Sequence, residues 1–355
     1  MRLRRSLFLP SPDSLQMIMT KFSTVLHAAL LSAAALTAWA GEKEPNPAAP
    51  PFLKPGDKIA VISPGSTPSE SAVSKGMEVL RNWGLVPVAG EYVTACYHLW
   101  AGTVAERKSD LLWALRDPSV KAILCARGGY GSSQLLHEIP VDTLKKYNKW
   151  MIGYSDITAL HSAWTRTGHM SIHANMCGRL SETGGQDSLS LVLHDLLLGR
   201  LPSYTVKGHP CNHPGQARGI LIGGNMSVMV NMSGSKTWDF LDRDYLANRD
   251  VVLFFEDVSE NISRVSSMLY QLKLKGALDR VRGIIVGHFT GYEPSAGYSD
   301  MYEMLHEFLQ GYDIPICYDF PTSHDEALNY PLVEGCPVTL SVTKERVSLD
   351  FNMSR

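Results

Sequence analysis

Residues 150–167 read WMIGYSDITALHSAWTRT and join two kinds of secondary structure. The apolar run at residues 150–153 is typical of a short buried strand. Residues 157–167 have the pattern of a helix, and only the turn at residues 154–156 separates the two. A strand that passes directly into a helix is the repeating unit of folds with a parallel sheet. The stretch therefore predicts an α/β fold.

The same alternation extends toward the N-terminus. Strands are predicted at 58–62, 85–88 and 122–126, and helices at 69–83, 103–116 and from about 132. The helix at 103–116 has Thr103 at its start and Glu106 three residues on, which is a capping box. Strands that alternate with helices predict a mostly parallel sheet. We assign this sheet to an N-terminal domain at residues 56–170.

A second unit follows a less regular segment, residues 171–214, which we interpret as a connector. Beyond it, strands are predicted at 218–225, 251–255 and 281–287, helices at 262–274 and 302–309, and a pair of strands between 337 and 351. The predicted fold is a two-domain α/β protein. An N-terminal parallel-sheet domain carries Ser155, and a smaller C-terminal α/β domain at residues 215–350 has a β-rich end.

The first forty residues have the features of a secretory signal peptide. Lys21 precedes an apolar stretch at residues 28–40, which ends in the small-residue motif AWA and is followed by polar residues. The stretch is shorter than the roughly 20 residues that a membrane-spanning helix needs. We therefore expect cleavage near Ala40, export to the periplasm, no stable membrane anchor, and a linker at residues 41–55.

Composition narrows the classes of function. The chain has 355 residues, of which 45% are hydrophobic and 19% charged, as in soluble globular proteins. Its formal net charge of −2 gives no reason to expect a nucleic-acid partner. None of the six cysteines forms a CxxC pair or a Cys/His group at zinc spacing. No metal or other cofactor is expected from these patterns.

Ser155 is the first candidate for chemistry. It follows a predicted strand and precedes a predicted helix, so a tight turn would present its hydroxyl beside the N–H groups of a helix N-terminus. Gly153 lies two residues before it, but Ile157 stands where a nucleophile elbow usually has a second glycine. The alternative is that Ser155 is an ordinary helix N-cap.

Two further motifs lie at predicted strand ends. The glycine-rich loop at residues 127–131 would let backbone N–H groups approach an oxyanion. The alternative is an ordinary turn between a strand and a helix. A phosphate-binding loop is disfavoured because no Lys-Ser/Thr pair follows the glycines. Glu256 and Asp257 end an apolar strand, where carboxylates need polar partners. Glu256 could orient a catalytic histidine; the alternatives are a salt bridge to Arg264 or a role for Asp257 as a helix N-cap.

Three histidines near these motifs could act as the base. His161 lies on the helix after Ser155, His288 ends a predicted strand, and His324 follows the segment FPTS. Spacing alone does not choose among them.

Several motifs in fixed order give the chain a resemblance to a known family. They are ISPGS (62–66), ARGGYGS (126–132), IGYSDITALH (152–161), IGGN (222–225), FEDV (255–258) and DFPTSH (319–324). Together they resemble the LD-carboxypeptidases, the muramoyl-tetrapeptide carboxypeptidases. The resemblance runs from about residue 57 to 340.

The resemblance implies a catalytic triad. Its serine matches Ser155, its glutamate matches Glu256 and its histidine matches His324. The family usually has glycine immediately before the histidine, whereas this chain has Ser323. This departure puts the position of the histidine loop in question.

The resemblance also implies the reaction. Family members use serine acyl transfer, without a cofactor, to remove the terminal D-alanine from murein tetrapeptides, in peptidoglycan turnover or recycling. The bond that they cut follows an L-centre. The implied oxyanion hole consists of backbone N–H groups of Asp156, Gly129 and Tyr130. Arg127 is our candidate for binding the substrate carboxylate, because its guanidinium can form two parallel hydrogen bonds.

Two alternatives remain at this point. A sister branch of the family hydrolyses peptide-nucleotide antibiotics and gives self-immunity. A periplasmic peptide-binding protein without enzymatic activity would also have two α/β lobes and a signal peptide.

Members of the family that the chain resembles often form homodimers, so the resemblance implies a homodimer.

Overall fold

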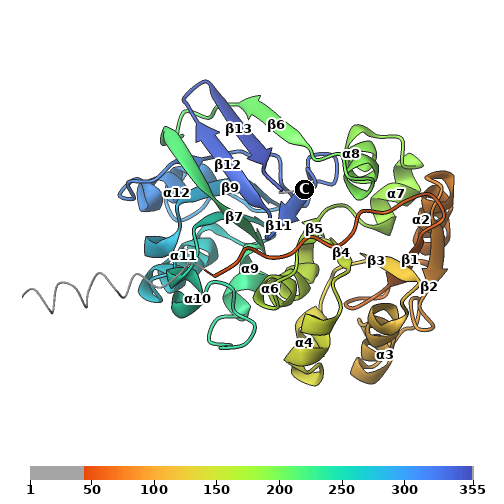
Figure 1. Cartoon of the computed structure of the whole chain (residues 1–355). Helices are drawn as coiled ribbons and strands as arrows, with labels where there is room; N and C mark the ends of the chain where they lie inside the picture. The colour runs from red at the N-terminus through yellow and green to blue at the C-terminus, as the bar shows by residue number, and fades with distance from the viewer. Residues whose placement is uncertain (1–43, 354–355) are drawn as a thin grey trace, which may run out of the picture. The chain divides into compact units, whose positions relative to one another are not determined.

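The computed structural model describes residues 44–353, which contain two β-sheets surrounded by helices (Figure 1). The predicted signal peptide lies outside the described residues. The strands are β1 (Lys58–Ile62), β2 (Val86–Ala89), β3 (Val120–Cys125), β4 (Trp150–Gly153), β5 (Ser171–His173), β6 (Ser203–Lys207), β7 (Gly215–Asn225), β8 (Val251–Val258), β9 (Gly283–Thr290), β10 (Ile316–Cys317), β11 (Leu332–Glu334), β12 (Pro337–Val342) and β13 (Arg346–Phe351).

The α-helices, in chain order, cover both flanks of these sheets. They are α2 (Glu70–Asn82), α3 (Val104–Arg116), α4 (Ser132–Glu138), α5 (Val141–Lys146), α6 (Thr158–Arg166), α7 (Cys177–Thr183), α8 (Ser188–Leu197), α9 (Met226–Asn231), α10 (Arg243–Ala247), α11 (Ile262–Leu274) and α12 (Met301–Leu309). Short 3-10 helices are η1 (Ser155–Ile157) and η2 (Leu278–Arg280).

The N-terminal sheet has the strand order β11-β5-β4-β3-β1-β2. All its neighbouring pairs are parallel except β11 with β5. The strands β1, β3 and β4 are almost entirely buried, as expected for parallel strands that are covered by helices on both faces. Parallel strands end at the same edge, so the loops after β1, β3 and β4 meet there.

Local sequence signals explain where the first helices begin. Ser69 caps α2 by accepting a hydrogen bond from the backbone N–H of Ala72, and the predicted capping box of Thr103 and Glu106 is present at α3. Gly84 follows α2 with a φ of +81°, a left-handed conformation that favours glycine.

The C-terminal sheet has the order β10-β9-β8-β7-β12-β13-β6. Its first four strands are parallel, and β12, β13 and β6 are antiparallel additions. Strand β8 is buried from Val251 through Asp257, which includes two carboxylates at its end. The predicted α/β fold with a parallel N-terminal sheet and a β-rich C-terminal end is confirmed.

Two segments outside the predicted domains pack closely against the sheets. Residues 171–214, interpreted as a connector, contain β5, α7, α8 and β6. In the segment interpreted as a linker, Ala48 forms a bridge with His169, and Leu53 is buried. This segment crosses the front of the N-terminal sheet in Figure 1.

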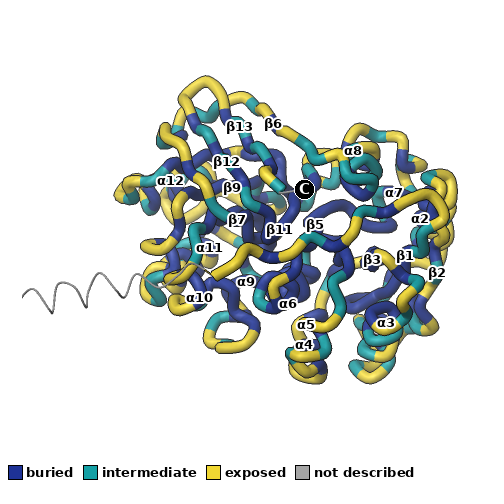
Figure 2. Tube along the Cα trace, in the orientation of Figure 1, coloured by how far each residue is buried: buried dark blue, intermediate teal, exposed yellow. Residues whose placement is uncertain are grey.

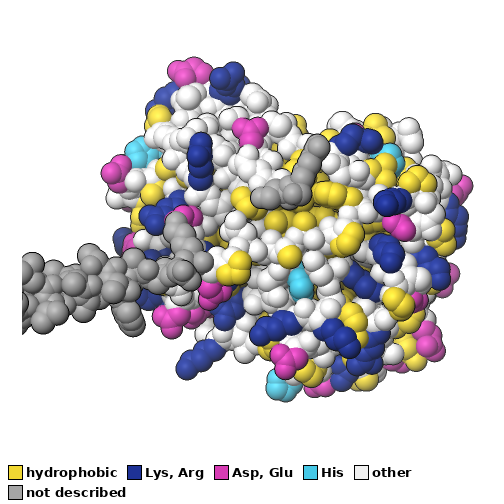
Figure 3. Space-filling view, viewed as in Figure 1, with side chains coloured by type: hydrophobic (Ala, Val, Ile, Leu, Met, Phe, Trp, Pro, Cys, Tyr) yellow, Lys and Arg dark blue, Asp and Glu magenta, His cyan; other side chains and the backbone are white. Residues whose placement is uncertain are grey.

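The apolar core is continuous between the sheets. One cluster contains Ile59 and Val61 of β1, Ile172 of β5, Leu221 of β7 and Phe254 of β8. Figure 2 shows buried strands at the centre of both halves, and Figure 3 shows charges of both signs interspersed over this face. Among residues 44–353, no helix has the length and apolar character needed to cross a membrane.

Candidate active site

Ser155 lies at the turn between β4 and α6. Its φ of +65° is in the left-handed region, which is strained for a residue other than glycine. Gly153 has no room for a side chain, because an added Cβ would lie 2.8 Å from Ile157 Cγ1. The missing second glycine of the elbow is thus explained by packing: the Ile157 side chain fills the space that Gly153 leaves.

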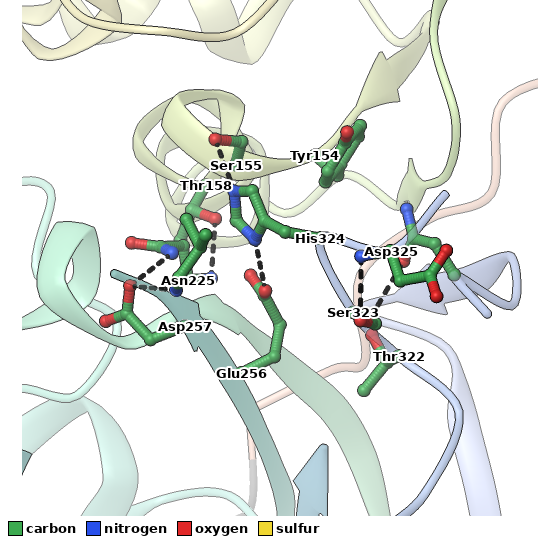
Figure 4. A network of polar contacts seen from close by, with 12 residues as sticks. Tyr154, Ser155, Thr158, Asn225, Glu256, Asp257, Thr322, Ser323, His324 and Asp325 are labelled. Atoms are coloured by element: carbon green, nitrogen blue, oxygen red, sulfur yellow. Dashed lines mark hydrogen bonds and ion pairs between the residues drawn. The ribbon is translucent and has the colours of Figure 1, made fainter. Parts of the chain in front are cut away.

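His324 stands between Ser155 and Glu256 (Figure 4). Its Nε2 lies 2.8 Å from Ser155 Oγ, and its Nδ1 lies 2.5 Å from Glu256 Oε2. An ionised carboxylate only accepts hydrogen bonds, so Nδ1 carries the proton and Nε2 can accept the proton of the serine hydroxyl. The three residues are therefore arranged as a nucleophile, a base and a group that orients the base.

The surroundings favour the charged form of this histidine. Glu256 is fully buried, and its Oε1 has no hydrogen-bond partner among the described residues. Burial lowers the pKa of His324, but the charge of Glu256, their hydrogen bond and the charges of Asp257 and Glu326 outweigh it, so the pKa is raised. The site thus stabilises the imidazolium that forms when His324 takes a proton.

Asp257 faces away from the histidine and organises the neighbouring element. It accepts hydrogen bonds from Asn225 Nδ2 at 2.9 Å and from the backbone N–H of Ser227 at 2.8 Å, at the start of α9. Burial, followed by the charge of Glu256, raises the pKa of Asp257 to about 6. The alternative partner Arg264 lies near Glu260 instead, with Nε at 3.9 Å from its carboxylate.

The other two candidate histidines have different partners. His161 is buried and contacts the carbonyl of Gly153 at 2.9 Å through Nε2, and His288 pairs with Asp319 at 3.1 Å. Ser323, the departure from the family pattern, is buried and accepts a hydrogen bond from the N–H of Asp325 at 2.8 Å. Its hydroxyl therefore supports the turn that carries His324.

The glycine-rich loop after β3 lies directly beside the serine turn. An added Cβ at Gly128 would lie 3.1 Å from Ser155 Cβ and 3.3 Å from the backbone nitrogen of Asp156. The N–H of Tyr130 already donates to Ser66 Oγ at 3.1 Å. The N–H groups of Gly129 and Asp156 have no acceptor within residues 44–353, so these two remain free for an oxyanion.

Sequence patterns did not reveal Arg107, which joins the loops around the site. Its side chain is buried, and its Nη1 donates to the carbonyls of Pro64 at 2.7 Å and Gly131 at 2.9 Å, while Nη2 donates to Gln134 at 2.6 Å. These contacts tie the loop after β1 to the loop after β3. No local signal marks such a residue, because its partners are distant in sequence.

Ser155 borders two cavities. One has a volume of about 500 Å³ and is lined by residues that include Arg127, Tyr154, Glu182 and Glu326. The other, of about 410 Å³, contains His324 and Asp257 together with the aromatic residues Trp100 and Tyr130. Arg127 is exposed, and its Nη1 donates to the carbonyl of Thr67 at 2.8 Å. A substrate can therefore extend on both sides of the serine.

Comparison with known proteins adds to this geometry. The model of the LD-carboxypeptidase N-terminal domain matches residues 59–174, and that of the C-terminal domain matches residues 218–340. A Synechocystis protein named as a carboxypeptidase is 33% identical over 77% of this chain and 87% of its own length. The microcin C7 self-immunity protein of Escherichia coli is 25% identical over 87% of this chain and 96% of its own length. The crystal structure of muramoyltetrapeptide carboxypeptidase from Oxalobacter formigenes is 27% identical, with a TM-score of 0.72, and covers 83% of this chain and 99% of its own.

Proposed function

Because this chain belongs to the LD-carboxypeptidase family, we propose that it is a serine peptidase that removes the terminal D-alanine from murein tetrapeptides. The observation that carries the proposal is the line of hydrogen bonds from Ser155 through His324 to Glu256, at the border of two cavities. The product would be a tripeptide, as expected in peptidoglycan turnover or recycling.

The geometry supports the following sequence of steps. His324 takes the hydroxyl proton as Ser155 Oγ attacks the scissile carbonyl carbon, and Glu256 stabilises the imidazolium. The N–H groups of Gly129 and Asp156 face the oxygen that becomes negative. His324 then gives its proton to the nitrogen of D-alanine, and the C–N bond breaks to leave an acyl-enzyme. Water repeats the attack and releases the tripeptide.

Charged residues of the larger cavity match the charges of such a substrate. Arg127 can bind a carboxylate, and Glu182 and Glu326 can face an ammonium group such as that of diaminopimelate or lysine. Tyr154 donates a hydrogen bond to Glu326 Oε1 at 2.9 Å, which holds this carboxylate in place.

The test is release of D-alanine from a disaccharide tetrapeptide. Ser155→Ala and His324→Ala should each lower kcat by about 10³-fold or more, and the double variant should be little worse than either, because triad members act as a unit. His288→Ala is the matched control and should keep most activity. An active His324→Ala with an inactive His288→Ala would contradict the assignment of the base. A tetrapeptide that ends in L-alanine should not be cleaved.

A second candidate is hydrolysis of a peptidyl nucleotide, the kind of activity expected of a self-immunity protein. Trp100 and Tyr130 line the smaller cavity, and Tyr130 is 73% exposed, so both offer surfaces on which a base could stack. The same assay with a peptidyl-nucleotide substrate separates the two. If kcat/KM is higher for the nucleotide and falls in Trp100→Ala, the murein assignment is wrong.

We also propose that the protein is exported and that its leader is cleaved near Ala40. Within residues 44–353 the first β-bridge is made by Ala48, so cleavage near Ala40 leaves this packed segment intact. Edman sequencing of the native protein should begin near Gly41. Recovery from the cytoplasm of a chain that still carries the apolar stretch at residues 28–40 would contradict export.

A further inference from the structure

Three buried side chains outside the proposed triad converge between the two sheets. They are His161 of α6, His173 at the end of β5 and Glu334 at the end of β11, and each has 0% exposure. One ligand atom from each lies within 4.8 Å of the other two. Glu334 is far from the two histidines in the sequence, so no familiar metal-ligand spacing marks this group.

Hydrogen bonds fix the tautomer of His161. Its Nε2 faces the carbonyl of Gly153 at 2.9 Å, and a carbonyl can only accept, so Nε2 carries the proton. Nδ1 is therefore an acceptor. It receives the hydroxyl of Ser171 at 2.8 Å and lies 3.9 Å from Glu334 Oε1.

His173 is held in the same tautomer by a chain of amides. Asn175 Nδ2 donates to the carbonyl of Glu326 at 2.7 Å, and Asn329 Nδ2 donates to Asn175 Oδ1 at 3.1 Å. Asn329 Oδ1 is thus the acceptor that faces His173 Nε2 at 3.2 Å. His173 Nδ1 remains unprotonated and has no partner among the described residues.

Polar side chains with unsatisfied acceptor atoms therefore lie close together in a fully buried interior. Glu334 Oε1 also lacks a partner within residues 44–353, although Glu334 Oε2 accepts a hydrogen bond from the N–H of Gly223 at 3.4 Å. The Ser171 hydroxyl donates to His161 Nδ1, and the Thr322 hydroxyl lies 3.4 Å from His173 Nε2. Unpartnered buried acceptors are costly, and a shared cation would satisfy His173 Nδ1 and Glu334 Oε1 and could also be bound by His161 Nδ1 in place of the Ser171 hydroxyl. Two neutral imidazoles and one carboxylate are a ligand set that zinc accepts.

We propose that His161, His173 and Glu334 bind one divalent transition-metal ion of the zinc type. Atoms within 4.8 Å of one another have a common centre about 2.8 Å or less from each, so side-chain shifts of under ~1 Å would bring them to zinc distances of about 2.0–2.2 Å. The protonated nitrogens already bond to Gly153 and Asn329, as metal-bound histidines commonly do.

The ion would be structural and would not take part in proton transfer at Ser155. It would connect α6, which follows the serine, to β5 and β11. Through Asn329, which also accepts a hydrogen bond from the N–H of Ser323 at 3.4 Å, it would support the loop that carries His324. Metal binding would thereby help to keep Ser155 and His324 in their positions relative to each other.

The test uses the untagged full chain and measures metal content and thermal stability, so it does not depend on the proposed activity. After chelator treatment and dialysis, added Zn²⁺ should restore one ion per chain and raise Tm by about 5 °C or more. Co²⁺ in its place should give visible absorption bands of a low-coordinate site. Glu334→Gln and His173→Asn should each abolish the stoichiometric ion and the Tm response.

His169→Asn is the matched control. His169 is also buried with a free Nδ1, but it lies outside the cluster, so this variant should keep the ion. If the wild-type chain binds no Zn²⁺ and its Tm does not respond, a proton on Glu334 is the shared cation and the proposal is wrong. An equal Tm response in wild type and Glu334→Gln would place the ion elsewhere and would also overturn it.

Discussion

At the scale of single residues, the site depends on one strained position and one short line of hydrogen bonds. A φ of +65° at Ser155 costs free energy that the surrounding packing has to offset. The strain directs the hydroxyl toward His324 Nε2, 2.8 Å away. A residue that only capped a helix would not require this conformation, which argues against the N-cap alternative.

The pH dependence of kcat/KM follows from His324. The histidine must be neutral to accept a proton, and its pKa is raised above the ordinary histidine value of about 6.5 because the charge of Glu256, their hydrogen bond and the charges of Asp257 and Glu326 outweigh burial. The rate should therefore fall as pH decreases through a value above 6.5. Glu256→Gln should move this acid limb to lower pH and lower kcat strongly, because the amide favours the wrong tautomer. If the fall of kcat/KM at low pH is unchanged in Glu256→Gln, a group other than His324 controls it.

At the scale of elements, the sequence was informative where apolar runs were long. Strand β8 and helix α11 were predicted close to their observed bounds, because five consecutive apolar residues and a clear helical period mark them. The three-residue strands β5 and β11 carry no such pattern, and β11 ends in the buried Glu334. Ser155, Glu256 and His324 could be predicted from motifs, whereas Arg107 and the His161 cluster depend on contacts that only the fold creates.

Arg107 gives a prediction about how the loops are held. Arg107→Lys keeps the charge but cannot reach Pro64, Gly131 and Gln134 together, and each lost hydrogen bond to a charged group costs about 1.5–3 kcal/mol. We expect a lower free energy of unfolding by about 2 kcal/mol or more and at least a ~10-fold loss of kcat/KM. Denaturant unfolding and the D-alanine assay measure the two effects. Arg116→Lys, at an exposed position on the same helix, should change neither.

At the scale of the whole described region, the proposed triad is divided between the sheets. Ser155 follows β4 of the N-terminal sheet, whereas Glu256 lies in β8 of the C-terminal sheet. Helix α6 meets β7 at a close contact, where Thr158 Oγ1 accepts a hydrogen bond from the N–H of Asn225 at 3.0 Å. The distance between Ser155 and His324 therefore depends on how closely α6 and β7 approach each other at this contact.

Gly224→Ala tests this dependence. An added Cβ would lie 2.4 Å from Thr158 Oγ1, so the two sides must move apart, and a displacement of about 1 Å can cost ~10²-fold in rate. We expect kcat/KM to fall by about that factor in a chain that still folds by circular dichroism. Gly234→Ala also has a positive φ, but its Cβ meets nothing within 4 Å, so it should keep its activity. Equal losses in both variants would mean that backbone strain alone is responsible.

The short strand β11 has a consequence for the order of folding. It completes the N-terminal sheet beside β5, although the paired residues Ser171 and Glu334 lie far apart in the sequence. When a ribosome has synthesised only the first half of the chain, strand β11 does not yet exist. Until residues 332–334 have been synthesised, β5 can pair with β4 on one side only, and its other edge stays unpaired. Pairing at such long range is slow, so the chain would remain accessible to chaperones until its synthesis is almost complete.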